Sequence, residues 1–315
     1  MLRELLGENK RVRDITREDC RRIQEILCSS PPNASKRLPG LTLEQAAATA
    51  KQRGWAPLHH TTATSYLNNL SALFNWAVKE AHIEKNPAVG LKVAAPQRQS
   101  KSRLPFSTEQ LNLIFHAPLY VAAAGDVESR DGRFWVPLLS LWTGMRLNEC
   151  VQLRTDDVTV RDGVDVILIR ADEEGDKRLK TDASERFVPI HRELKKIGFL
   201  TYVAKMKRAG SVRLFPELPK GKRGYYSDPF QKWFSRFLIS ISAKTRKTSF
   251  HSFRHCFRDV LRDADMSTER VRVLGGWTPK GGAEEIYGAG HRASTLAKEI
   301  EKVRYPGLDL SHLYL

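Results

Sequence analysis

The stretch FHSFRHCFRDVLRDA, residues 250–264, carries the strongest local pattern in this sequence. Four of its apolar side chains recur at the three- and four-residue spacing of a helix, namely Phe253, Phe257, Val260 and Leu261. We therefore predict an amphipathic helix that buries this stripe. His251 and Arg254 are three residues apart, so the helix presents both on one side. His255 lies next to the stripe and, on this pattern alone, is a packed histidine.

Helical patterns and a pair of short strands surround this segment. Helices are predicted for residues 134–142, 147–153, 229–241 and 268–274, and another begins at Ser107. Strands are predicted for residues 164–170 and 186–190, which a polar, charged stretch joins. The expected fold class is therefore mainly α with a small antiparallel β-sheet, that is α+β.

A second, mostly helical domain is expected ahead of this region. In residues 1–93 the best helix covers 61–78, where apolar residues recur at helical spacing. Residues 94–105 (AAPQRQSKSRLP) are polar, basic and proline-bounded, and we interpret them as an interdomain linker. Residues 106–315 then form the second domain with a C-terminal tail, and a length of 315 residues suits two compact domains.

The chain is strongly basic. It has 52 Lys and Arg against 36 Asp and Glu, which gives a net charge of +16. The excess is concentrated in residues 203–247, where twelve basic residues face only Glu217 and Asp228 as acids and aromatic residues are interleaved. Concentrated basic charge with aromatic side chains is typical of a surface that follows nucleic-acid phosphates.

Several classes of protein are disfavoured by the composition. No apolar run is long enough to span a membrane, and the charged N-terminus lacks the apolar middle of a signal peptide. The four cysteines are scattered without a CxxC pair, which argues against a zinc site and a disulfide framework and fits the cytoplasm. The sequence contains no phosphate-binding P-loop and no convincing metal cluster, so neither a metal nor another cofactor is expected.

Further candidate residues stand on both sides of the 250–264 helix. TGMRLNE (143–149) places Arg146 and Glu149 three residues apart, a spacing that a surface ion pair also explains. Lys180 lies between the two predicted strands, where a lone lysine is usually a solvated charge. LGGWTPKGGAEEIYG (274–288) contains Trp277 and Tyr287, each of which could by itself belong to the core.

Taken in order, as R…K…HxxR…W…Y, these residues resemble the tyrosine recombinase/phage integrase family. The resemblance covers about residues 105–300 and is closest to phage and mobile-element integrases. The run Gly275-Gly276-Trp277-Thr278 is similar to the Cre-type variant, in which tryptophan replaces a second histidine. The segment LFNWAVKEAHIEKNPAVGL in the first domain also looks like the end of that family's core DNA-binding domain.

The resemblance implies a role for each residue of the set. Arg146 and Arg254 are expected to grip the phosphate oxygens, because planar guanidinium groups do this in bidentate fashion. Tyr287 is the expected nucleophile, since a phenol oxygen can keep the bond energy as a phosphate ester. His251 is the candidate base, and Lys180 the candidate acid for the leaving 5′ oxygen.

Three more residues complete the expected site. Trp277 is expected to donate its indole N–H to the phosphate, while Glu149 and His255 are supporting residues that orient the arginines and the histidine. The implied product is a 3′-phosphotyrosyl DNA with a free 5′ hydroxyl. The implied partner is double-stranded DNA with an inverted-repeat core site, bound by a homo-tetramer that could be a monomer when free. An accessory directionality factor is compatible with this hypothesis.

Other functions remain open on the sequence alone. A sequence-specific DNA-binding protein that has lost catalysis would share the basic charge, although it needs no complete set of six reactive residues. A type IB topoisomerase would share the chemistry but would relax supercoils without a specific site. An RNA-binding module would explain the charge but not the ordered residues.

Overall fold

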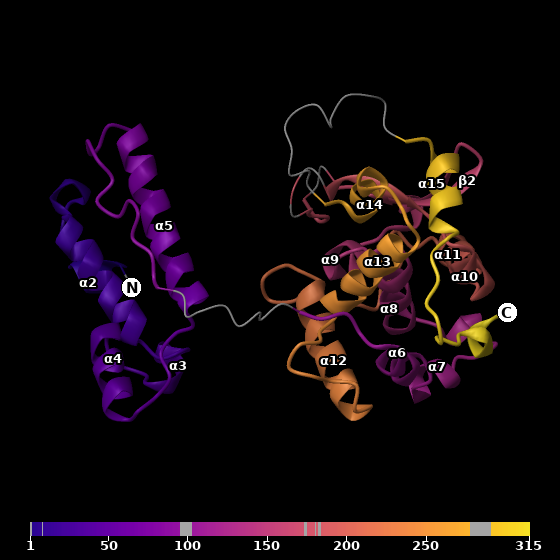
Figure 1. The fold of residues 1–315 in the computed structure, drawn as a ribbon, viewed down its shortest axis with the longest axis horizontal. Coiled ribbons are helices and arrows are strands. Elements are labelled where there is room, and N and C mark those ends of the chain that lie inside the picture. Colours follow the sequence, from indigo (N-terminus) through magenta and orange to yellow (C-terminus); the bar gives the residue numbers. More distant parts are fainter. Residues whose placement is uncertain are drawn as a thin grey trace. The chain divides into compact units, whose positions relative to one another are not determined.

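The computed structural model of the chain describes residues 2–7, 9–94, 103–172, 175–179, 181, 184–277 and 291–315. The chain divides into two compact units, Met1–Ser100 and Lys101–Leu315 (Figure 1). The domain bounds and the linker at 94–105 stay predictions, because most of that linker lies outside the described residues.

The first unit is helical. Its elements are α1 (Leu2–Leu6), a 3-10 turn η1 (Val12–Asp14), α2 (Arg17–Ser29), α3 (Ala34–Arg37), α4 (Leu43–Gln52) and α5 (His60–Lys79). The predicted helix at 61–78 is confirmed as α5. Thr16 and Thr42 begin α2 and α4 with reciprocal capping hydrogen bonds, which explains where these helices start. The buried stripes of α2 and α5 form the core of the unit.

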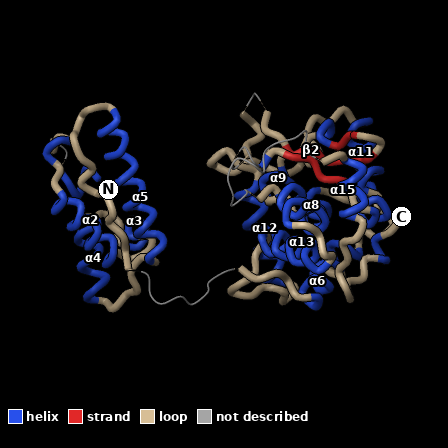
Figure 2. Tube along the Cα trace, turned by 45° about the horizontal axis from the view of Figure 1, so that its top comes forward, coloured by secondary structure: helices blue, strands red, loops and turns tan. Residues whose placement is uncertain are grey.

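The second unit is mostly helical as well. Its helices are α6 (Thr108–Phe115), α7 (Pro118–Val121), α8 (Gly132–Thr143), α9 (Leu147–Val151), α10 (Arg192–Lys196), α11 (Phe199–Arg208), α12 (Ser227–Ser240), α13 (His251–Asp263), α14 (Thr268–Gly275) and α15 (Ala293–Ile300). Short 3-10 turns are η2 (Val127–Ser129), η3 (Thr155–Asp157) and η6 (Ser311–Leu313). The tube in Figure 2 shows one small sheet at the top of this unit, with α8, α12, α13 and α6 below it.

The sheet has three antiparallel strands in the order β1 (Val158–Arg161), β2 (Val164–Ile169) and β3 (Arg186–Pro189). The two strands predicted from the sequence pair with each other, Val166 opposite Pro189. Strand β1 was not predicted. It joins β2 through Asp162 and Gly163, whose φ angles of 52° and 73° form the tight hairpin turn that an Asp-Gly pair favours.

Helices α8 and α13 pack against each other in the centre of the second unit (Figure 1). The helix predicted for 250–264 is confirmed as α13, and Phe253, Phe257 and Leu261 of its stripe are fully buried. Val260, predicted for the same stripe, is only half-buried. The fold class, mainly α with a small antiparallel sheet, is thus confirmed.

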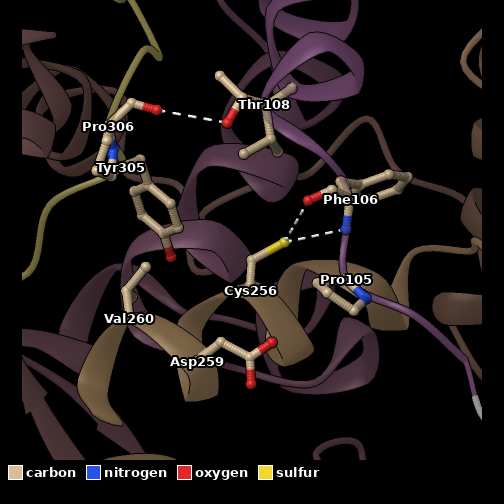
Figure 3. A pocket seen from close by; sticks show the side chains of 9 residues that line it. Pro105, Phe106, Thr108, Cys256, Asp259, Val260, Tyr305 and Pro306 are labelled. Atoms are coloured by element: carbon tan, nitrogen blue, oxygen red, sulfur yellow. Dashed lines mark hydrogen bonds between the residues drawn. The ribbon is translucent and has the colours of Figure 1, made fainter. Parts of the chain in front are cut away.

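The two ends of the second unit meet on α13. The backbone N–H of Phe106 donates to the Cys256 Sγ at 3.2 Å, and the Thr108 hydroxyl donates to the Pro306 carbonyl at 3.4 Å. A cavity of about 190 Å³ lies between these segments (Figure 3). Burial raises the pKa of Cys256 to about 12, so this thiol stays protonated at neutral pH.

The C-terminal tail packs onto the second unit itself. Leu310 and Leu313 are buried, and the Leu313 carbonyl accepts a 3.0 Å hydrogen bond from the buried guanidinium of Arg130. The Leu315 N–H donates to the Lys196 carbonyl at 3.0 Å. In this structure the tail therefore docks on its own chain. Among the described residues no helix is both long and apolar enough to cross a membrane.

Candidate active site

Arg146 is positioned by a sharp turn between two helices. Helix α8 ends at Thr143 and is capped by Gly144, which has a φ of +65°, and α9 begins at Leu147, directly after Arg146. A Cβ at Gly144 would lie 2.3 Å from the Phe257 ring, so both the backbone angle and the packing require glycine here. The predicted Thr-Gly break is thus the point where α13 packs against the end of α8.

Glu149 is the buried counter-charge of the site. Its side chain is 3% exposed, and its Oε1 accepts from Arg146 Nη1 at 2.6 Å. Its Oε2 accepts from the Arg146 backbone N–H at 2.9 Å and from Arg186 Nη2 at 3.0 Å. Burial raises the pKa of Glu149, but the charge of Arg186 and these hydrogen bonds outweigh it, so the pKa lies below its usual value.

Arg254 extends from α13 toward the same place. It is 3% exposed and donates to the Gly144 carbonyl and, at 3.4 Å, to the Gly276 carbonyl. Arg146 Nη2 donates to that same Gly276 carbonyl at 3.3 Å. Burial, followed by repulsion from Arg146 and Arg186, lowers the pKa of Arg254 to about 9. Two guanidinium groups therefore meet at one carbonyl oxygen, and one of them is a buried cation in need of an anion.

Trp277 packs on Arg254. The Arg254 Cζ lies 4.4 Å from the centroid of the indole ring, a cation–π contact. Helix α14 ends at Gly275 and is capped by Gly276, which has a φ of +58°, and a Cβ at Gly275 would lie 1.7 Å from the indole. The Gly-Gly-Trp run is thus explained by the turn that brings the tryptophan back over Arg254.

His251 and His255 both come from α13. His251 is exposed in the first turn, and His255 is half-buried one turn later. Their rings lie 4.9 Å apart at 89°. Burial lowers the pKa of His255, which favours the neutral ring. His251 is on the same helix as Arg254, as the spacing predicted.

Lys180 and Tyr287 lie outside the described residues, so their places in the site stay predictions. The structure brings together Arg146, Glu149 and Arg254. Trp277 packs on Arg254, and the two histidines stand on the helix that carries this arginine. Six of the eight predicted site residues can therefore be followed in the described part of the chain.

Sequence reasoning missed Arg186 and Ser184. Arg186 bonds to Glu149 and donates to the Leu274 carbonyl at 3.0 Å, which ties β3 to the end of α14. The Ser184 hydroxyl accepts from Arg146 Nη1 at 3.0 Å. The one available signal was a cation at the start of an otherwise apolar strand, RFVPI. Among the residues that the structure describes, no group of three or more His, Cys, Asp or Glu side chains could hold a metal ion.

Comparison with known proteins gives a consistent picture. The model of the phage integrase family matches residues 108–291, more than half of the chain. A lambda integrase dimer bound to a COC′ core site is similar in structure, with a TM-score of 0.50 and 15% identity, covering 93% of this chain and 81% of that one.

Two further structures match at lower TM-scores. The integrase of mycobacterium phage Brujita has a TM-score of 0.44 and 18% identity over 91% of this chain and 85% of that one. A Tn1549 transposon integrase variant with transposon right end DNA has a TM-score of 0.49 and 19% identity over 93% of each chain. At these identities the likeness concerns the fold alone. No curated protein matched the chain.

Proposed function

Because this chain belongs to the phage integrase family of tyrosine recombinases, we propose that it is a site-specific recombinase that cleaves and rejoins DNA through a 3′-phosphotyrosine at Tyr287. Family membership makes DNA strand cleavage and rejoining the expected class of reaction. The observation that carries the proposal is the convergence of Arg146 and Arg254 on the Gly276 carbonyl, under Trp277.

The charges of this cluster favour a phosphate ligand. Arg146, Arg186 and Arg254 share one carboxylate, Glu149, so the four side chains have a net charge of +2. Arg254 bonds only to backbone carbonyls among the described residues, and its cation is destabilised by burial. A phosphodiester would supply the missing negative charge, and its reacting phosphorus bears still more charge on the non-bridging oxygens in the transition state. Pre-aimed charge of this kind is usually the largest single catalytic contribution.

The geometry also suggests how the phosphate would enter. The hydrogen bonds from the two Nη2 atoms to the Gly276 carbonyl are long, at 3.3 and 3.4 Å. Hydrogen bonds between an arginine and a phosphate oxygen are shorter and stronger. Phosphate oxygens would therefore displace the carbonyl as the acceptor for both arginines, while Glu149 keeps Arg146 in place.

The proposed reaction then needs one nucleophile, one base and one acid. The Tyr287 phenol oxygen forms the new bond to phosphorus, and the bond from phosphorus to the 5′ oxygen breaks. His251 accepts the phenol proton, and Lys180 protonates the leaving 5′ oxygen. The reverse attack by a 5′ hydroxyl from a partner strand restores the phosphodiester. Bond energy is kept in the protein–DNA ester throughout, so this route consumes no nucleotide.

Double-stranded DNA is the proposed substrate and partner. The net charge of +16 supports affinity for phosphates, and such affinity falls steeply with salt. Strand exchange joins two core sites with two protomers on each, so we propose a tetramer on DNA. We also propose that the helices of the first unit bind DNA.

Covalent trapping tests the proposal directly. The protein and its Tyr287→Phe variant would be incubated with nicked fragments of host and element DNA, from which a short 5′-hydroxyl piece can diffuse away. After denaturation, DNA still attached to protein would be recovered and sequenced. Tyr314→Phe is the matched control, since this phenol of the C-terminal tail already donates to Glu193 of α10.

We expect covalent DNA with the wild type and the Tyr314 variant, and none with the Tyr287 variant. Trapped ends clustered at one inverted repeat support a recombinase, whereas ends scattered over the DNA indicate a topoisomerase. Absence of covalent DNA at every salt concentration, with binding intact, would leave a DNA-binding protein without catalysis.

A further inference from the structure

A second cavity is lined in part by Arg146 and Glu149, and its other lining residues have no role in the proposed chemistry. Its volume is about 360 Å³. Three segments line it: the start of α9, the hairpin residues 178–179 and the loop 223–228 at the start of α12. Because Arg146 is shared, a ligand in this cavity would lie next to whatever Arg146 binds.

The backbone of Arg178 is fixed beside this cavity by hydrogen bonds to two side chains, those of Gln152 and Asn148. Its N–H donates to the Gln152 Oε1 at 3.1 Å. Its carbonyl accepts from Gln152 Nε2 and from Asn148 Nδ2, each at 3.3 Å. Gln152 is itself buried, and Asn148 also donates to it at 2.8 Å. The helix that begins after Arg146 therefore places Arg178 as well, so the two arginines are positioned by one element.

The Arg178 side chain is also positioned. Its Nε donates to the Gly175 carbonyl at 3.1 Å, and its Cζ lies 5.6 Å from the centroid of the Tyr225 ring. In the described part of the chain the two terminal nitrogens of this guanidinium have no hydrogen-bond partner, so both can bind a ligand. Arginine lying on an aromatic ring loses less side-chain freedom when it binds an anion.

The loop that carries Tyr225 is attached to the same hairpin. Lys220 forms an ion pair with Asp176, and the Tyr226 hydroxyl lies 3.5 Å from the other oxygen of that carboxylate. Arg213 lies over the Tyr226 ring at 3.8 Å. The opposite walls of the cavity are thus linked to each other, which makes it a built site rather than a gap between loops.

Among the described residues that line the cavity, Arg178 is the cation without a carboxylate partner. Glu149 is occupied by Arg146 and Arg186, and Asp228 forms a two-point ion pair with Arg223 at 2.9 and 3.0 Å. Within the described part of the chain, no carboxylate lies at ion-pair distance from Arg178. The cavity therefore matches a ligand with a single negative charge, such as one backbone phosphate.

We propose that this cavity binds the DNA phosphate next to the scissile one, with Arg178 as its cationic ligand and Tyr225 as the ring that supports it. This inference rests on the proposed function, since Arg146 marks the scissile phosphate only if the chain cleaves DNA. Two adjacent phosphates of one strand would then be held by two arginines placed by α9. The second contact fixes the register of the strand at the point of cleavage.

The test combines one substitution with one altered phosphate. The substrate is the site recovered by covalent trapping, made as a set of duplexes with a single uncharged methylphosphonate at each position flanking the cleaved bond. Affinity is measured with Tyr287→Phe as the background, and cleavage with the active protein. Arg178→Ala is compared with Arg208→Ala, an exposed arginine at the end of α11 that does not line the cavity.

On the unmodified duplex we expect Arg178→Ala to weaken binding about 10-fold and Arg208→Ala to change it less than about 2-fold. A methylphosphonate at one flanking position should weaken DNA binding by the wild type by a similar factor. It should hardly change DNA binding by the Arg178→Ala variant. Inorganic phosphate at millimolar concentration should not reproduce the effect, since the site belongs to a strand and not to a free anion.

The proposal is overturned if the Arg178→Ala effect is the same on every methylphosphonate duplex, or if inorganic phosphate alone abolishes it. A failed recombinase hypothesis gives a different result, because then covalent DNA is either absent or scattered over the DNA, and no single cleavage site is recovered. In that case the salt dependence of binding to any duplex still tests whether Arg178 contacts a DNA phosphate. The negative slope of log affinity against log salt should become shallower by about 0.9 for Arg178→Ala and stay unchanged for Arg208→Ala.

Discussion

Replacement of Glu149 by glutamine should destabilise the second unit, because it removes the carboxylate that pairs with Arg146 and Arg186. The substitution keeps the size of the side chain but removes the negative charge that Arg146 and Arg186 share at 2.6 and 3.0 Å. Three arginines would then stand together with no carboxylate in the cluster, two of them buried or nearly so. The new amide would also direct N–H donors at the guanidinium groups.

We expect a large decrease in the free energy of unfolding. Removing one partner from a buried ion pair destabilises a protein by about 3–5 kcal/mol, because an uncompensated charge stays buried. For a unit of this size, about 3 kcal/mol corresponds to a decrease in Tm of roughly 6–12 °C. Arg146 would also lose its main support, so covalent DNA should fall by about 100-fold or more.

The pH dependence gives an independent check. Since the folded pKa of Glu149 lies below its usual value near 4.5, its contribution is present above the unfolded pKa and is lost as pH falls through the folded pKa. The difference in the free energy of unfolding between wild type and Glu149→Gln should therefore be constant above about pH 5 and shrink below pH 4.5.

Amide hydrogen exchange in α9 and α13 is the suitable assay, because it reports on the second unit without contribution from the first. Glu185→Gln is the matched control: this neighbour of Arg186 is exposed, and its replacement should change stability by less than about 0.5 kcal/mol. A loss below about 1 kcal/mol for Glu149→Gln, or a loss that persists unchanged to pH 3, would refute the account of the site.

Three further predictions concern other parts of the second unit. Gly144→Ala should destabilise it by about 2–4 kcal/mol in urea unfolding, because the residue has a φ of +65° and its Cβ would lie 2.3 Å from Phe257; an unchanged midpoint would contradict this packing. Arg254→Lys should lower covalent trapping about 100- to 1000-fold while DNA affinity changes only a few-fold, since an ammonium group cannot replace the two-point contact of a guanidinium with a phosphate. Trapping equal to that of the wild type would exclude Arg254 as a ligand of the scissile phosphate. His191 is fully buried against Trp142, and burial lowers its pKa to about 4, so the stability of the wild type should fall by up to about 3 kcal/mol as pH decreases from 6.5 to 4. His191→Gln should remove this dependence, and a variant with the same pH profile as the wild type would show that another group titrates there.

Much of the fold followed from local patterns. The apolar spacing in 250–264 predicted α13, and the alternating segments predicted β2 and β3 with their antiparallel pairing. These features depend on neighbours a few residues apart, which is the range over which helix and strand periodicity act. Strand β1 was missed although the Asp-Gly turn before β2 was visible, because VTVR is short and only its first residue is buried.

Part of the candidate site could also be predicted from the sequence. The order of Arg146, Lys180, HxxR, Trp277 and Tyr287 indicated the family, and the family model confirmed it. Lys180 and Tyr287 remain predictions of the sequence, since they lie outside the described residues.

Only the tertiary structure decided which of these residues act together. Arg254 reaches a carbonyl 110 residues away in the sequence, and Arg146 reaches one 130 residues away. No local pattern contains such contacts, because they depend on the packing of α13 against α8 and on the turns at Gly144 and Gly276. In the sequence Arg178 was indistinguishable from a solvated charge, and Arg186 stood out only as a cation at the start of an otherwise apolar strand. Folding gave Arg186 a buried carboxylate and left Arg178 beside a cavity, and the difference between them is one of burial and partners, which the chain acquires only when distant segments come together.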